Sequence, residues 1–459
     1  MSTKCISTDL KITQSKHKKD SINQKLESKI QVGFFRAILG QKVLANRLHG
    51  ILAGILCALF LSAFIYLEHF LDNKNFPLYS TLFAILGLFL YFKLSRLGAF
   101  VCGGILGILW FYWVGFSFRF YDLSHLIPLV WIVFFVVYGA LFYLFCFFSS
   151  PFYRLVALTL SSFIHPFGFN WFIPEVILTK SYFFPSKFTL FLLLCSILIL
   201  SAFLAKKLYK TSLIWLCSFA LLLPHNTEIK KDSNIMPLRI KTTHFEVPQD
   251  ERWQTNQMPN ILTQNFETIL KAKNAGYDLV ILPETAFPLS LNLQSALLEK
   301  LKEESKEIAI LTGAIFQDSI QEKPRFFNSA YLFQNGEMQV FHKLILVPFG
   351  EKIPLPNFIA KWMNAFFFDG AQDFIAQDFI APNFAWIKNQ KFQIAICYEA
   401  TRDEFYANSP SNLIAISNNA WFVPSIEPTL QKLLMLYFSK NHNTTIYHSS
   451  NASEDFTLH

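Results

Sequence analysis

Residues 97–118 read LGAFVCGGILGILWFYWVGFSF, a stretch without a single charged side chain. A helix rises 1.5 Å per residue, so about 20 apolar residues cross the ~30 Å hydrocarbon core of a bilayer. Within lipid the backbone must satisfy its own hydrogen bonds, which a helix does. We therefore predict that this stretch is a transmembrane helix and that the chain is an integral membrane protein.

Further apolar runs on both sides of this stretch predict a membrane α-helical bundle of about seven spans. The runs lie at about 50–71, 77–94, 97–118, 124–148, 155–178, 187–205 and 211–224. The composition agrees, because 53% of the residues are hydrophobic and only 16% are charged, whereas soluble domains are nearer one quarter charged. The fifth run contains Pro166, Gly168 and Pro174, so it either lines a polar cavity or is a kinked helix with its ends in the interface.

The distribution of Lys and Arg predicts the orientation of the bundle. The segment 1–49 is a basic tail, and if it is cytoplasmic, sixteen Lys and Arg residues lie on that side against four in the opposite loops. Basic residues accumulate on the cytoplasmic side of membrane proteins. Seven crossings place everything after about residue 225 on the far side. The net charge of +8 is therefore better explained by a membrane anchor than by nucleic-acid binding.

From Pro237 onward the pattern changes to that of an α/β domain. DLVIL at 278–282 is predicted as a buried strand, and 238–247 as another. Residues 260–276 have the periodicity of an amphipathic helix. SAYLFQNGEMQVF at 329–341 alternates about Asn335–Gly336, a strong signal for a two-residue hairpin. We predict three regions: the tail 1–49, a transmembrane domain 50–225 and a layered α/β domain 226–459. The tandem AQDFI at 371–380 is interpreted as a loop that tolerates insertion.

Three chemically active residues stand at the ends of predicted strands in this domain. Glu284 follows DLVILP, Lys343 follows MQVFH and Cys397 ends FQIAI. Strand ends are where α/β proteins place their sites. Cys397 is also the one cysteine of seven that falls outside the apolar runs and the tail, and none forms a CxxC pair, so neither a zinc site nor a disulfide framework is expected.

Together these three residue types can perform nucleophilic acyl chemistry. A cysteine attacks as the thiolate, which requires a base or a nearby cation. A carboxylate can accept the proton, and an ammonium can stabilise both the thiolate and the oxyanion formed on attack. His342 is adjacent to Lys343 but faces the opposite way on an alternating strand. From these residues alone, other interpretations stay open: a lone cysteine after a strand is more often a small buried residue, the glutamate could cap a helix, and the lysine could be a solvated loop residue.

Three short sequence motifs resemble those of a known family. LVILPETAFP, FHKLILVPFGEKIP and AICYEA are similar to the three motifs of the nitrilase superfamily, in their expected order. With the preceding spans, the chain from about 50 to 453 resembles apolipoprotein N-acyltransferase of Gram-negative inner membranes. The resemblance implies a nitrilase-like αββα sandwich, a periplasmic catalytic domain and no cofactor or metal.

The resemblance also implies roles for particular residues. Glu284 would be the general base, Lys343 the stabiliser of thiolate and oxyanion, and Cys397 the nucleophile. Glu351 would be a second, positioning carboxylate. Further supporting residues implied by the motifs are Tyr398, Glu399 and Trp253, the last being equally compatible with an interfacial anchor. The implied partners are a membrane phospholipid as acyl donor and a diacylglyceryl apolipoprotein as acceptor.

The last stretch departs from the family pattern. Asn419 stands where the family usually has Asp, Gln431 where His is usual, and Asn441 where Glu is common. The polar ending after residue 441 cannot supply a membrane span, and we expect the α/β domain to be short at its C-terminus.

Two other functions stay open at this point. The first is a membrane-tethered nitrilase-like amidase, in which water replaces the amine acceptor; seven spans are excessive for a tether. The second is a non-enzymatic transporter or sensor, which would be expected to carry ionisable residues within its spans. Apart from Glu68 and Glu175, the apolar runs contain almost none, so acyl transfer is the function that the sequence favours.

Overall fold

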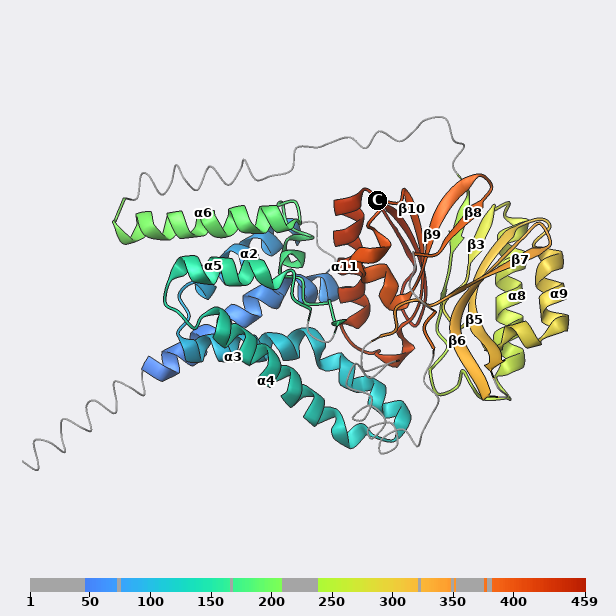
Figure 1. The fold of residues 1–459 in the computed structure, drawn as a ribbon, viewed down its shortest axis with the longest axis horizontal. Helices are drawn as coiled ribbons and strands as arrows, with labels where there is room; N and C mark the ends of the chain where they lie inside the picture. Colours follow the sequence, from blue (N-terminus) through green and yellow to red (C-terminus); the bar gives the residue numbers. More distant parts are fainter. Residues whose placement is uncertain are drawn as a thin grey trace, which may run out of the picture.

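The computed structural model describes residues 46–71, 76–165, 168–208, 238–320, 323–347, 351, 375–377 and 382–459. The predicted tail up to residue 45, the seventh apolar run and most of the AQDFI repeat lie outside these residues. Figure 1 shows a bundle of helices from the first half of the chain beside a layered α/β domain from the second half.

Four helices in the described part of the chain are long and apolar enough to cross a membrane. They are Asn46–Phe70, Arg96–Tyr121, Ser124–Phe145 and Lys187–Leu204. The second contains α3 (Arg96–Phe111) and the 3-10 segment η1 (Tyr112–Tyr121), and the third contains α4 (Ile127–Phe145). The fourth lies within α6 (Lys187–Ala205). Helix α2 (Phe76–Tyr91) is apolar but shorter. The predicted count of about seven spans is therefore not confirmed, although the membrane character is.

The fifth apolar run is not one helix, which corrects the expected span at 155–178. Helix α5 covers only Pro151–Ser161, and η4 is a short 3-10 turn at Pro174–Leu178. Pro174, at the start of η4, cannot donate a backbone hydrogen bond and is unfavourable inside a regular helix. Trp171 and Phe172 in the connecting segment are buried, so the segment packs inside the protein between the bundle and the α/β domain.

Helices α3 and α4 pack closely because α3 presents glycines to its neighbour. A Cβ atom at Gly103 would lie 2.2 Å from the carbonyl oxygen of Tyr138, and one at Gly107 would lie 2.7 Å from that of Phe134. Small residues let helix backbones approach in membranes, where dispersion contacts drive association. The glycines of the stretch 97–118 thus determine how this part of the bundle assembles.

The α/β domain contains two six-stranded sheets, as far as the structure describes it. The first has the order β1-β3-β5-β6-β7, with β4 added beside β5. Its strands are β1 (Ile240–Thr242), β3 (Leu279–Ile281), β4 (Phe287–Ser290), β5 (Ala309–Ile320), β6 (Lys323–Gln334) and β7 (Glu337–His342). The predicted hairpin at Asn335–Gly336 is confirmed, because β6 and β7 are antiparallel about it.

The second sheet has the order β12-β11-β10-β9-β8, with β2 beside β11. Its strands are β2 (His244–Phe245), β8 (Phe384–Ile387), β9 (Gln390–Ile396), β10 (Asn412–Asn418), β11 (Thr445–Asn451) and β12 (Phe456–Leu458). The predicted strand 238–247 is thus two strands, because β1 pairs in one sheet and β2 in the other. The polar ending after residue 441 supplies β11 and β12, which sequence polarity did not predict.

Side-chain alternation joins the two sheets into a sandwich with helices on both outer faces. Ile414 and Ile416 of β10 pack against Leu279 and Ile281 of β3 in a core between the sheets, as the two-residue period of a strand requires. The outer face of the first sheet is covered by α8 (Met258–Asn274) and α9 (Ser295–Glu304). The second sheet is covered by α11 (Glu427–His442). This arrangement confirms the predicted αββα layers.

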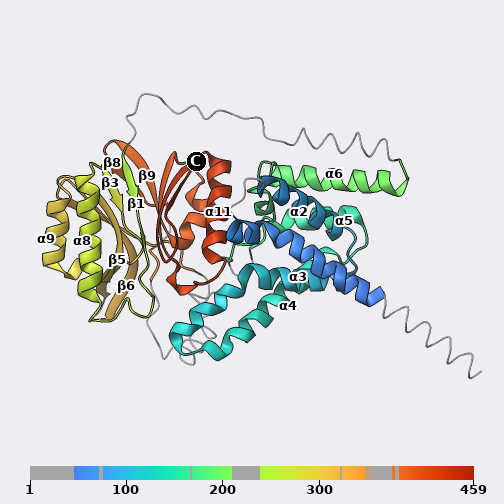
Figure 2. The same cartoon turned by 180° about the vertical axis from the view of Figure 1, so that it is seen from behind.

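Helix α11 lies between the second sheet and the membrane helices, as the reverse view in Figure 2 shows. Its apolar side chains belong to the same buried cluster as those of the bundle. Polar contacts cross the same boundary: the Tyr437 hydroxyl donates to Oε1 of Glu175 at 3.0 Å, and the Trp171 indole donates to Oγ1 of Thr401 at 2.8 Å. The α/β domain is therefore fixed to the membrane bundle through its second sheet.

Candidate active site

Glu284 lies in a tight turn shortly after β3, and the residue is 5% exposed. The Nδ2 group of Asn328 donates to its Oε1 at 2.6 Å. The turn passes close over β5, where a Cβ atom at Gly313 would lie 2.6 Å from the Cα of Glu284. The guanidinium of Arg252 donates to the carbonyl oxygens of Glu284 and Thr285, both at 3.1 Å. The backbone that carries the carboxylate is thus held from both sides.

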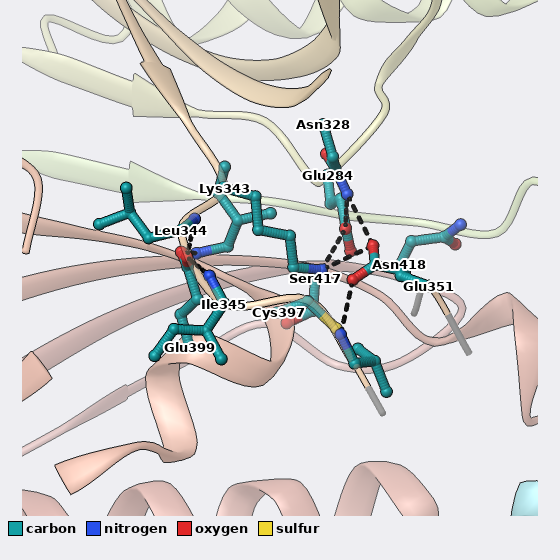
Figure 3. A network of polar contacts seen from close by, with 12 residues as sticks. Glu284, Asn328, Lys343, Leu344, Ile345, Glu351, Cys397, Glu399, Ser417 and Asn418 are labelled. Atoms are coloured by element: carbon teal, nitrogen blue, oxygen red, sulfur yellow. Dashed lines mark hydrogen bonds and ion pairs between the residues drawn. The ribbon is translucent and has the colours of Figure 1, made fainter. Parts of the chain in front are cut away.

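Lys343 follows β7 directly and is 1% exposed. Its Nζ lies 2.8 Å from Oε1 of Glu351 and 3.6 Å from Oε1 of Glu284. Asn328 also approaches Glu351, at 3.3 Å, so one lysine and one amide bridge two carboxylates (Figure 3). His342 points elsewhere, as predicted, and its ring packs against the rings of Phe316 and Phe327.

Cys397 stands at the junction of β9 and the 3-10 turn η7 (Cys397–Thr401). Its φ angle is +55°, in the left-handed region that side chains other than glycine rarely adopt. Such a conformation is costly and is kept where the surrounding structure fixes it, often at functional sites. Figure 3 shows Cys397 beside the end of the Lys343 side chain.

The electrostatics of the cluster follow from burial and from these pairings. Burial raises the pKa of Glu284, and the neighbouring Lys343 ammonium opposes this increase. Burial acts against the charge of Lys343, but the carboxylates of Glu351 and Glu284 more than compensate and raise its pKa. Burial and Glu284 raise the pKa of the Cys397 thiol, with Lys343 acting in the opposite direction. The resting site therefore holds an ammonium beside a protonated thiol, and a proton acceptor is needed to make the nucleophile.

The remaining predicted residues hold the site in place or lie at its border. Glu399 accepts from the backbone N–H groups of Leu344 and Ile345 through Oε1, at 2.6 and 3.0 Å, and from Ile396 through Oε2 at 2.8 Å. It thereby ties the Lys343 loop to the end of β9. Burial raises its pKa to about 7.

Tyr398 and Trp253 take no part in the hydrogen bonds through which Glu399 ties the Lys343 loop to β9. Tyr398 points toward the membrane bundle, where its hydroxyl oxygen accepts from the backbone N–H of Asn170 at 3.2 Å. Trp253 lies in the turn after β2 with 46% of its surface exposed. Its neighbour Arg252 makes the contacts with the Glu284 turn. The role predicted for Trp253 stays a prediction.

Three residues at the site were not predicted to act there. Asn328 is buried on β6 and bridges the two carboxylates, and an asparagine inside a strand is a weak signal because strands are depleted in it. Gln431 and Glu427 both lie on α11, one helical turn apart, and each is 1% exposed. In the sequence, Gln431 was noted only as a departure from the histidine that is usual in the family. No pattern in the sequence pointed to Glu427.

The fold and the cluster define an integral membrane protein with an αββα domain that carries buried glutamate, lysine and cysteine side chains at its strand ends. Residues 48–222 match the apolipoprotein N-acyltransferase integral membrane domain. The apolipoprotein N-acyltransferase of Wolinella succinogenes is 41% identical over 86% of this chain and 92% of that protein. Those of Helicobacter pylori and Campylobacter jejuni are 36% and 34% identical, over 87% and 88% of their lengths. The chain belongs to the apolipoprotein N-acyltransferase family.

Among solved structures, an amidase of the nitrilase superfamily from Nesterenkonia AN1 is similar over 48% of this chain and 78% of that chain, with 13% identity and a TM-score of 0.33.

Proposed function

We propose that this enzyme transfers an acyl chain from a membrane phospholipid, through a thioester on Cys397, to the N-terminal amine of a diacylglyceryl-modified apolipoprotein. The observation that carries the proposal is the buried arrangement of Lys343 between Glu284 and Glu351 beside a cysteine in left-handed conformation. Family membership supplies the substrate classes.

In the first half-reaction Glu284 accepts the proton of the Cys397 thiol, and the sulfur attacks the ester carbonyl carbon of the phospholipid. The negative charge that develops on the carbonyl oxygen is stabilised by the Lys343 ammonium. The C–O bond then breaks, the lysophospholipid oxygen takes the proton back from Glu284, and a thioester remains. Glu351 and Asn328 keep the lysine and the base in position throughout.

In the second half-reaction the amine of the apolipoprotein attacks the thioester carbonyl carbon. The C–S bond breaks, the electron pair returns to the sulfur, and Glu284 accepts the proton that the nitrogen loses. Both substrates are anchored in lipid, so the site must lie beside the bilayer. The docking of Tyr398, Thr401 and Tyr437 onto the membrane bundle supports this placement.

A cavity lies at the border of the two domains, and its lining does not include Glu284, Lys343 or Cys397. It has a volume of about 850 Å³ and is lined by Phe120 and Arg119 of η1 and by residues of the α/β domain that include Val423 and Ala420. Arg119 donates to the carbonyl oxygen of Val423 at 2.9 Å, so membrane and α/β segments meet at its wall. The cavity offers both apolar and charged surface to a lipid with a polar headgroup.

We further propose that the basic tail is cytoplasmic, that residues 226–459 form the catalytic domain and that this domain is periplasmic. The excess of Lys and Arg in the loops assigned to the cytoplasm supports this orientation. Single cysteines at the exposed positions Lys271 and Glu303, in a variant lacking the native cysteines, should react with a membrane-impermeant maleimide in intact spheroplasts. Protection until the membrane is permeabilised would contradict a periplasmic domain.

The function is tested by mass spectrometry of lipoprotein N-termini in cells whose sole copy of the gene encodes either the natural chain or Cys397→Ala. We expect N-acylated cysteine with the natural chain and only the diacylglyceryl form with the variant. N-acylation that persists with Cys397→Ala would overturn the proposal.

A further inference from the structure

An amide pair lies on the side of Cys397 that faces α11. The Nε2 group of Gln431 lies 3.9 Å from the sulfur of Cys397. Gln431 is 1% exposed, so no bulk water competes for its N–H groups. A thiol sulfur is a weak acceptor, whereas an anionic acceptor strengthens a hydrogen bond about twofold.

The orientation of the Gln431 amide is set by Asn419. The Nδ2 group of Asn419 donates to Oε1 of Gln431 at 3.2 Å and to Oγ of Ser453 at 3.1 Å. Asn419 is itself 1% exposed. Because the oxygen of Gln431 is occupied as an acceptor on the Asn419 side, its nitrogen is the atom that faces the sulfur.

We propose that Gln431 is a further catalytic residue, which donates an N–H group to the Cys397 sulfur whenever that sulfur carries negative charge, and that Asn419 is the positioning residue that aims it. In its application to lipid substrates this inference rests on the proposed function. The donation itself concerns only the thiol and can be measured without lipid.

An N–H donor at the sulfur would stabilise negative charge in both half-reactions. Loss of the thiol proton to Glu284 leaves the charge on sulfur, and cleavage of the C–S bond during transfer to the amine returns an electron pair to the same atom. Lys343 is the cation of the cluster, but its ammonium is shared with Glu351 and Glu284 and must also stabilise the carbonyl oxygen. A second, neutral donor at the sulfur would stabilise the thiolate, so that Lys343 need not stabilise both the sulfur and the carbonyl oxygen.

The neutrality of the donor matters because the surroundings of the sulfur are already rich in carboxyl groups. The titratable groups that act on Cys397 are Glu284, Lys343, Glu427 and Glu351. Three of these four oppose a charge on sulfur. An amide lowers the energy of the thiolate without adding a group that titrates or pairs with them.

The test measures the alkylation of Cys397 in the full-length protein in detergent micelles. Iodoacetamide is added at pH 8, and the peptide that contains Cys397 is quantified by mass spectrometry over time. Gln431→Met keeps the length of the side chain and removes the N–H groups. We expect its alkylation rate to fall about three- to tenfold, the effect of losing one hydrogen bond to a charged group offset in part by the greater nucleophilicity of a more basic thiolate.

Two further variants separate donation from packing. Asn419→Asp offers Gln431 an acceptor instead of a donor, so the amide should turn its oxygen toward the sulfur and slow alkylation to a similar extent. Gln249→Met is the matched control, because Gln249 is also a buried glutamine bonded to an asparagine, Asn418, at 2.9 Å. It should lower the thermal midpoint without changing the alkylation rate.

The inference would be overturned if Gln431→Met were alkylated as fast as the natural chain. It would also be overturned if Gln249→Met lowered the alkylation rate as much as Gln431→Met, because the effect would then come from packing. The outcome is independent of the proposed function: slow alkylation in Gln431→Met together with no acyl transfer by the natural chain would refute the function and leave the donor in place.

Discussion

The Nζ atom of Lys343 lies closer to Oε1 of Glu351, at 2.8 Å, than to Oε1 of Glu284, at 3.6 Å. The second carboxylate is therefore the main partner of the buried ammonium. This division leaves Glu284 available to accept a proton, because a carboxylate bound tightly to a cation is a weaker base. In the proposed mechanism Glu351 therefore holds the ammonium, while Glu284 is the base.

Glu351→Gln should therefore slow thioester formation on Cys397 at least tenfold, because Lys343 would lose its main partner and be drawn toward Glu284. Removing one partner of a buried ion pair also costs about 3–5 kcal/mol of folding free energy. Rapid-quench mass spectrometry with a phospholipid donor gives the rate. Glu303→Gln, which removes an exposed pair with Lys306, is the control and should leave the rate unchanged. Equal rates for both variants would show that Glu351 does not position the lysine.

Gly313→Ala should displace the turn that carries Glu284. The added Cβ atom would lie 2.5 Å from the backbone nitrogen of Thr285 and 2.6 Å from the Cα of Glu284, distances that backbone atoms cannot tolerate. We expect a loss of stability of about 1–3 kcal/mol from overpacking and a fall in thioester formation of tenfold or more. Gly336→Asn, at the tip of the β6–β7 hairpin, keeps a residue that tolerates positive φ and should not affect the rate. Normal activity of Gly313→Ala would contradict the assigned position of Glu284.

Glu399 should make the stability of the protein depend on pH. Its pKa is raised by burial to about 7 in the folded state, above the ordinary glutamate value of 4.5. The corresponding stability, about 3 kcal/mol, is fully present below pH 4.5 and is lost as the pH rises through 7. Glu399→Gln should flatten the dependence of the thermal midpoint between pH 5 and pH 8.

The same variant should also be less stable at pH 5, by about 1–3 kcal/mol, because its NH2 group cannot accept from the backbone N–H groups that face Glu399. Thermal unfolding followed by intrinsic fluorescence measures both effects. A pH profile in Glu399→Gln as steep as that of the natural chain would assign the dependence to another group.

Tyr398 should couple the active site to the membrane bundle. Its hydroxyl oxygen lies 2.9 Å from Oδ1 of Asn170, in the segment that replaces the expected fifth span. Tyr398→Phe should lower stability by about 1 kcal/mol and reduce acyl transfer severalfold. A double-mutant cycle with Asn170→Ala separates the pairwise energy from the single effects. Tyr331→Phe, which loses a hydroxyl contact within the first sheet, is the control. Strict additivity of the first pair would exclude the coupling.

The fold could be predicted wherever a local pattern decides the structure. Alternation around Asn335–Gly336 predicted the β6–β7 hairpin, and a charge-free run predicted α3. Local patterns could not show that the chain crosses from one sheet to the other between β1 and β2, because pairing partners far apart in sequence decide this. Nor did polarity reveal β11, whose polar residues are buried beside β10 and β2 rather than exposed.

The residues of the candidate site could be predicted where they stand at the ends of strands. Strand-end position made Glu284, Lys343 and Cys397 candidates, the resemblance to the family motifs assigned their roles, and the structure brings the three side chains into one cluster. Asn328 and Gln431 were not assigned roles, because their side chains reach the site from the middle of a strand and a helix. The direction of these side chains depends on how β6 and α11 pack, and no local sequence motif predicts this direction.

The central claim is that Cys397 carries the acyl chain between the two substrates, and trapping that intermediate tests it most directly. The purified protein is mixed in micelles with a phospholipid whose acyl chain is isotopically labelled, and is quenched in acid before an acceptor peptide is added. We predict a labelled acyl group on the peptide that contains Cys397, removable by hydroxylamine and transferred to a diacylglyceryl peptide when that is supplied. Acyl transfer to the acceptor without any labelled thioester on Cys397 would contradict the account.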